Sequence, residues 1–103
     1  MKSYQLVLQY KVSPGDLTGI NDLFELEELL SKVVKAPAQG DGHDVGSGEA
    51  NIFIVTPDPQ ETFEAIRPIL FRYSAEFKAA HRDFDEDEYS VLWPLNLRKF
   101  SLV

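Results

Sequence analysis

Residues 40–56, GDGHDVGSGEANIFIVT, restrict the fold more than any other stretch of the sequence. Residues 51–56 are β-branched and aromatic, and their near-continuous apolar character is typical of a strand in the middle of a sheet. Residues 41–46 contain glycine and aspartate, which weaken strand pairing and favour the edge of a sheet. With a turn at residues 46–48, GSG, the stretch predicts a hairpin of one edge strand and one central strand.

Two segments before the hairpin have regular periodicity. Residues 3–11 alternate with a period of two, which predicts a strand with apolar or aromatic side chains on one side, namely Tyr4, Leu6, Leu8 and Tyr10. Residues 20–34 repeat apolar residues at helical spacing and predict an amphipathic helix.

A second helix is expected after the hairpin. Asp58 stands at a capping position, Pro59 at the first helical position and Glu61 three residues after the cap. Because Pro68 lies within the apolar stripe that follows, this helix is expected to kink or break near residues 64–67.

Two further strands are expected at residues 76–84 and 88–94, around an acidic turn. The complete pattern predicts an α+β fold, a ferredoxin-like βαββαβ sandwich with an antiparallel sheet, two helices on one face and an extra C-terminal strand or tail. A length of 103 residues suits a single domain over residues 1–103.

Composition excludes several classes of function. The formal charge of −7 opposes contact with phosphate backbones, so a nucleic-acid partner is not expected. The absence of cysteine excludes disulfides and thiol nucleophiles. No apolar run approaches the length of a membrane helix and the start lacks the pattern of a secretory signal, so a soluble cytoplasmic protein without a membrane partner is expected.

The chain resembles a group of small bacterial proteins of unassigned function. The resemblance is carried by DGHDVGSGEANIFIVT and by the later stretch AAHRDFDEDEYSVLWP. It implies a small intact α+β domain and no particular reaction.

Glu27 is the first candidate site residue, because helical spacing places it within the apolar stripe that should face the core. A carboxylate there needs a partner, and the candidates are His43, His81, Arg67 and Arg82. A pair with His43 would hold one imidazole tautomer and raise the imidazole pKa, as general bases and pH sensors require. Alternatively, Glu27 only fastens the helix to the hairpin through Arg82 or backbone N–H groups.

Asp41, His43 and His81 are weak candidates for a metal site, because a regular strand would place the first two on one face. No established ligand spacing is present, so neither a metal nor a cofactor is expected. The glycines precede a strand rather than a helix, which favours turns and bulges over a phosphate-binding loop.

The acidic run at residues 83–88 offers a second kind of site. Its last four residues, Asp85, Glu86, Asp87 and Glu88, are candidates for binding a basic protein surface. A homodimer through the open sheet face is also expected, from apolar residues Val91, Trp93, Leu97 and Phe100. The leading hypothesis is thus a non-enzymatic protein-binding or regulatory, immunity-like module; the alternative is a small enzyme or a metal or ligand sensor that uses Glu27 and His43.

Overall fold

The computed structural model of the protein describes residues 3–11, 17–34, 38–46, 49–73 and 77–94. Along the chain, the secondary-structure elements are β1 (Tyr4–Lys11), α1 (Leu17–Val33), β2 (Gln39–Gly46), β3 (Glu49–Thr56), α2 (Pro59–Tyr73), β4 (Phe77–Asp83) and β5 (Ser90–Trp93). The α+β class, with two helices and an antiparallel sheet, is confirmed.

The five strands form one sheet in the order β2-β3-β1-β4-β5, and all neighbouring strands are antiparallel. β1 is central: Leu8 pairs with Ile52 on β3 and with Ala79 on β4. β2 lies at the edge of the sheet and β3 between two strands, as the hairpin prediction required. The turn predicted for this hairpin falls largely on residues 47–48, outside the described residues.

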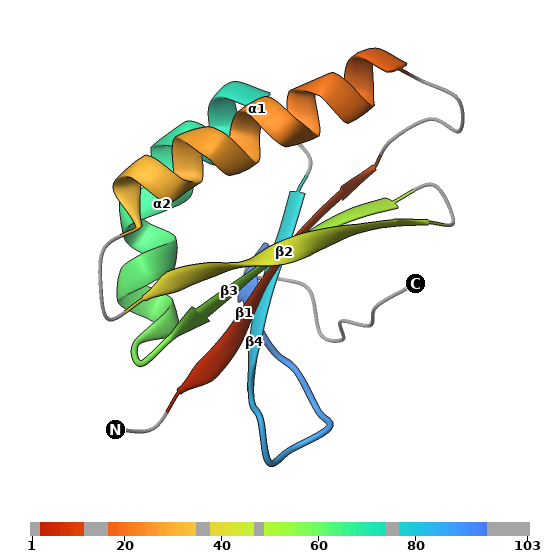
Figure 1. The fold of residues 1–103 in the computed structure, drawn as a ribbon. Helices are drawn as coiled ribbons and strands as arrows, with labels where there is room; N and C mark the ends of the chain where they lie inside the picture. The colour runs from red at the N-terminus through yellow and green to blue at the C-terminus, as the bar shows by residue number, and fades with distance from the viewer. Residues whose placement is uncertain (1–2, 12–16, 35–37, 47–48, 74–76, 95–103) are drawn as a thin grey trace.

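The main core lies between the sheet and the two helices, which cover the same side of it (Figure 1). The alternation of β1 sends Leu6 and Leu8 into this core, where they are almost completely buried. The helices contribute buried aliphatic and aromatic side chains, namely Leu26, Leu30, Phe63, Ile66 and Leu70. Burial of such side chains stabilises each by roughly 1.5–3 kcal/mol.

The opposite face of the sheet has a smaller buried cluster. Val7 and Ala80 are fully buried there, with partly buried Phe53, Tyr89 and Val91 around them. On the same face, Gln9 donates a hydrogen bond of 3.0 Å to Asn51, and both side chains are buried. A dimer through this face remains a prediction, and its contacts would come from the partly exposed side chains. Leu97 and Phe100 lie outside the described residues.

Helix α2 begins as the sequence predicts. The Asp58 carboxylate accepts a hydrogen bond of 3.0 Å from the backbone N–H of Glu61, which satisfies one of the free donors of the first turn. The backbone N–H of Asp58 itself donates to the Thr56 hydroxyl at 3.1 Å. These two bonds fix the backbone between the end of β3 and the first turn of α2.

The sequence predicted a kink or a break near residues 64–67, and no break occurs, because α2 is continuous from Pro59 to Tyr73 with Pro68 inside it. Pro68 is exposed, so the carbonyl that loses its helical partner can be solvated. Ile66 and Leu70 on either side are buried against the sheet. Their packing against the sheet opposes a proline penalty of about 3 kcal/mol. Among the described residues, no helix is long and apolar enough to cross a membrane.

Candidate functional site

A β-bulge in β2 determines where the side chain of His43 points. Gly40 pairs with Ile54 and His43 pairs with Ile52, so β2 uses one residue more than β3 over this step. The extra residue is accommodated around Gly42, whose φ is 94°, a conformation that glycine adopts without a steric penalty. Paired residues face the same side of a sheet, so His43 shares the helix-covered side with Ile52. In a regular strand, residues 40 and 43 would face opposite sides.

His43 there meets Glu27 from helix α1. Its Nδ1 lies 3.0 Å from Oε1 and 3.1 Å from Oε2 of the Glu27 carboxylate. Both side chains are about one third exposed, at 32% for His43 and 31% for Glu27. Glu27 is therefore at the rim of the core rather than inside it, and of its four candidate partners it contacts His43. The ring of Phe24 packs edge-on against the imidazole at 5.3 Å.

The contact orients the imidazole. In the neutral ring, a carboxylate at Nδ1 favours the tautomer that donates from Nδ1, which leaves Nε2 as the acceptor. Beside the pair is a pocket of about 230 Å³, lined by Glu27 and by core and hairpin residues including Leu30, Ser31 and Gly42. Ser31 donates its hydroxyl hydrogen bond to the Glu28 backbone carbonyl at 2.6 Å. The Ser31 hydroxyl is therefore bonded to the backbone of its own helix.

The three residues considered for a metal site are not brought together. His81 pairs with Leu6 on the central strand, so three strand spacings, roughly 14 Å, separate its strand from that of His43. Asp41 is exposed and lies in the bulge, which interrupts the regular alternation that was expected to align it with His43. The part of the chain that the structure describes contains no group of three metal-ligating side chains.

His81 instead occupies its own environment on β4. Its ring packs edge-on against Tyr4, with 6.0 Å between centroids. Its Nδ1 is buried and has no hydrogen-bond partner among the described residues. Burial lowers the pKa of His81 below its ordinary value, since charging the ring there costs hydration. The neutral imidazole is thus the form that fits the fold.

Arg82 does not contact Glu27, so that part of the alternative interpretation is wrong. As the neighbour of His81 in a strand, it faces the opposite side of the sheet and donates from Nε to Gln5 at 3.0 Å. Tyr89 donates to the same Gln5 oxygen at 2.9 Å. The remaining candidate is Arg67 on α2. Its guanidinium carbon lies 4.5 Å from the centre of the Trp93 ring.

The acidic residues form an ordered connection between β4 and β5, which projects beyond the sheet (Figure 1). We call residues 84–88 the acidic tip. Its four candidate carboxylates, on Asp85, Glu86, Asp87 and Glu88, are all exposed. Asp83 organises the turn: its carboxylate accepts from the N–H of Asp85 and its carbonyl from the N–H of Glu86, each at 3.0 Å.

The acidic tip also contains an apolar side chain that the sequence analysis did not single out. Phe84 is 45% exposed, and the Arg82 guanidinium lies 5.6 Å from its ring centre. Arg82 also donates to the backbone carbonyl of Glu86 at 3.0 Å. The sequence could have indicated an exposed Phe84, because a large apolar residue surrounded by acidic neighbours in a turn is seldom buried in the core.

Comparison with protein-family models gives no match, and comparisons with curated proteins and with solved structures likewise give none. The resemblance to small bacterial proteins stays a prediction.

Proposed function

We propose that this protein is a non-enzymatic binding or regulatory module, of an immunity-like kind, that recognises a basic protein surface through its acidic tip. The observation that carries the proposal is the combination of four exposed carboxylates with the exposed ring of Phe84 in one ordered turn. Charged groups steer association and specify the partner, while a buried aromatic anchor supplies affinity. The formal charge of −7 favours the same class of partner.

The acidic tip is held in shape before any partner binds. Arg82 links it to the sheet through Gln5 on β1 and through the Glu86 carbonyl in the turn. Asp83 closes the turn with two backbone bonds. A loop that is already ordered loses less conformational entropy on binding, which preserves affinity. The proposed partner therefore carries lysines or arginines around a pocket for Phe84.

The test is affinity capture of partners with two charge variants. The tip variant carries the changes D85N, E86Q, D87N and E88Q. The matched control neutralises four exposed helical carboxylates instead, by E25Q, E28Q, E61Q and E64Q. Both variants lose four negative charges, so their net charge is the same; the control also loses the exposed ion pairs of Glu28 with Lys32 and of Glu64 with Arg67. We expect a partner that the wild type and the control capture and the tip variant does not.

A third variant, Phe84→Ala, changes no charge and should weaken binding of that partner by about 2 kcal/mol or more if the ring is an anchor. Equal loss of binding in both charge variants would show that only net charge matters. Unchanged binding by the tip variant would remove the proposal.

A second candidate function uses the Glu27–His43 pair as a proton-exchange or ligand-sensing site. The observation in its favour is the 3.0 Å contact at the rim of a pocket. The test follows the His43 ring by NMR through neutral pH in wild type and in Glu27→Gln, with and without added manganese. A purely mechanical contact predicts that added manganese leaves the His43 ring signals unchanged in both proteins. Loss of the His43 signals with manganese in the wild type, but not in Glu27→Gln, supports the site.

We also propose a ferredoxin-like arrangement, a cytoplasmic location and a homodimer through the open sheet face. The order of the elements and the position of β1 between β3 and β4 support the first. Partly exposed Phe53, Tyr89 and Val91 support the dimer. Sedimentation of the wild type and of Val91→Glu tests it, since a charge at that position should leave only monomer.

A further inference from the structure

Two polar side chains on the sheet face opposite the helices are buried although no described element lies over them. Gln9 is 2% exposed and Asn51 is 1% exposed, and a hydrogen bond of 3.0 Å joins them. Among the described residues, both helices lie on the other side of the sheet (Figure 1), and the β4–β5 connection reaches this face through Tyr89, which bonds Gln5. An antiparallel sheet that is covered on one side only leaves its other face in contact with water. The burial of Gln9 and Asn51 therefore indicates a cover over this part of the face.

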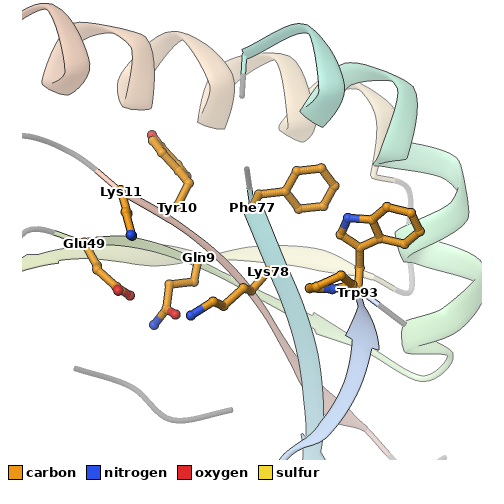
Figure 2. A pocket seen from close by; sticks show the side chains of 8 residues that line it. Gln9, Tyr10, Lys11, Glu49, Phe77, Lys78 and Trp93 are labelled. Atoms are coloured by element: carbon orange, nitrogen blue, oxygen red, sulfur yellow. The ribbon is translucent and has the colours of Figure 1, made fainter. Parts of the chain in front are cut away.

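Glu49 indicates the chemistry of that cover. Figure 2 shows the polar ends of Gln9, Glu49 and Lys78 on one side of the strands, away from Tyr10. Oε2 of Glu49 is buried and has no hydrogen-bond partner among the described residues. Lys11 pairs with Glu49 across the strands, but its side chain is exposed and forms no ion pair with that carboxylate. A buried charged acceptor without a donor is costly, so a cover that carries a cation is favoured.

The chain itself continues from this end of the sheet, where β1 and β5 end and β3 and β4 begin. Pro94 is the last residue described, and with Trp93 and Gln9 it lines a pocket of about 420 Å³ there. Residues 95–103, LNLRKFSLV, lie outside the described residues, and a fully extended segment of this length spans about 30 Å. Crossing from β5 over β4 and β1 to β3 takes three strand spacings, about 14 Å. The segment is therefore long enough to reach Asn51.

The composition of residues 95–103 matches the two requirements. More than half of the segment is apolar, and it has two cations, Arg98 and Lys99, and no acidic residue. Apolar side chains can be buried against partly exposed Phe53 on this face, and a cation can donate to Glu49. A segment that is covalently attached loses little translational freedom on docking, which favours it over a separate molecule of the same chemistry.

We propose that residues 95–103 dock on the sheet face opposite the helices, over Gln9 and Asn51, and that one of the two cations of the segment donates to Oε2 of Glu49. The docked segment closes this end of the face to other chains. The homodimer proposed above uses the part of the face around Val91, and the acidic tip lies beyond the sheet, so each of these proposals can fail without the others.

A spin label tests the docking, because the protein has no cysteine and one introduced cysteine gives a single labelling position. With a nitroxide on Ser101→Cys, the side-chain amide signals of Gln9 and Asn51 should lose most of their NMR intensity and regain it when the label is reduced. The control label is on Glu28→Cys, an exposed position of α1 on the other side of the sheet. It should broaden signals of the helix and leave the two amides much less affected.

A mixing experiment identifies the molecule that supplies the segment. Spin-labelled Ser101→Cys without isotope is mixed with isotope-labelled protein without a spin label. We expect no broadening of the Gln9 and Asn51 amides in the mixture. Broadening there would overturn the proposal, because a second copy would then provide the cover. Unchanged amide signals when label and isotope are on the same molecule would overturn it as well.

A mutant cycle tests the contact with Glu49 through urea denaturation. The tail variant carries Arg98→Met and Lys99→Met, and the control variant carries Lys32→Met and Arg72→Met, two exposed cations of the helices. Glu49→Gln should be more destabilising in the wild type than in the tail variant, by about ten-fold in the unfolding equilibrium constant, as loss of a hydrogen bond to a charged group produces. In the control variant its effect should equal that in the wild type. An equal effect of Glu49→Gln in all three proteins, each shown by circular dichroism to be folded, would overturn the contact.

Discussion

Replacing Gly42 by alanine tests whether the bulge in β2 is what directs His43 toward Glu27. The φ of Gly42 is 94°, and an added Cβ would meet no atom within 4 Å. Any loss of stability must therefore come from backbone strain rather than from a clash. A side chain at positive φ costs about 1–3 kcal/mol. Alanine also reduces the entropy of the unfolded chain, which returns about 0.4–1 kcal/mol. The net expectation is a loss of roughly 1–2 kcal/mol.

Gly40 provides the matched control. It lies two residues earlier in the same strand, also has open space around an added Cβ, and does not have a positive φ. Gly40→Ala should therefore stabilise the protein by about 0.4–1 kcal/mol, because only the effect on the unfolded chain remains. The two variants should differ by about 2 kcal/mol in free energy of unfolding, with the wild type between them.

Urea denaturation of the three proteins measures this difference, provided that their m-values agree. The pH titration of the His43 ring by NMR then reports its contact with Glu27. If the strain is relieved by straightening β2, His43 turns away, and its titration in Gly42→Ala should match that in Glu27→Gln. Equal stability of Gly42→Ala and Gly40→Ala would refute the argument that the bulge needs glycine at position 42.

Three further predictions concern single positions. Because burial lowers the pKa of His81 below 6.5, the unfolded chain takes up a proton at higher pH than the folded chain. Stability should then be complete above about pH 6.5 and fall as the pH drops through the folded pKa, and His81→Asn should reduce this dependence in denaturation curves. Pro68→Ala should raise the free energy of unfolding by about 1–2 kcal/mol, since the regained helical bond outweighs the looser unfolded chain; an unchanged midpoint would contradict it. Asp58→Ala should lower stability by about 0.5–2 kcal/mol, whereas Asp58→Asn, which keeps the acceptor, should lower it less.

The sequence predicted features that depend on neighbouring residues. The cap at Asp58 and the alternation of β1 require only local geometry, and both are confirmed. The pairing of β2 with β3 was also predicted correctly from the sequence. A segment rich in glycine and aspartate next to a strongly apolar strand is typical of a hairpin at the edge of a sheet. At Pro68 the sequence left a kink and a break both open, because the continuity of α2 also depends on the packing of Ile66 and Leu70 on either side.

The candidate sites depended on tertiary structure and were less predictable. Glu27 was identified as needing a partner, but the choice among four partners depends on the strand register and on the bulge, which no residue pattern specified. The pocket beside Trp93 gathers residues from four strand ends, and its members have no common motif. Such a set becomes visible only when the order of the strands is known.

The central position of β1 has a consequence for synthesis of the chain. Tyr4 pairs with Thr56 on one side and with Asp83 on the other, so β1 is synthesised before both of its partner strands and must wait for them. Until β4 emerges, one edge of β1 has unpaired backbone groups and exposed apolar side chains, which are features of aggregation-prone intermediates. Nascent chains stalled before Phe77 should therefore bind holdase chaperones, and those that include all of β4 should release them.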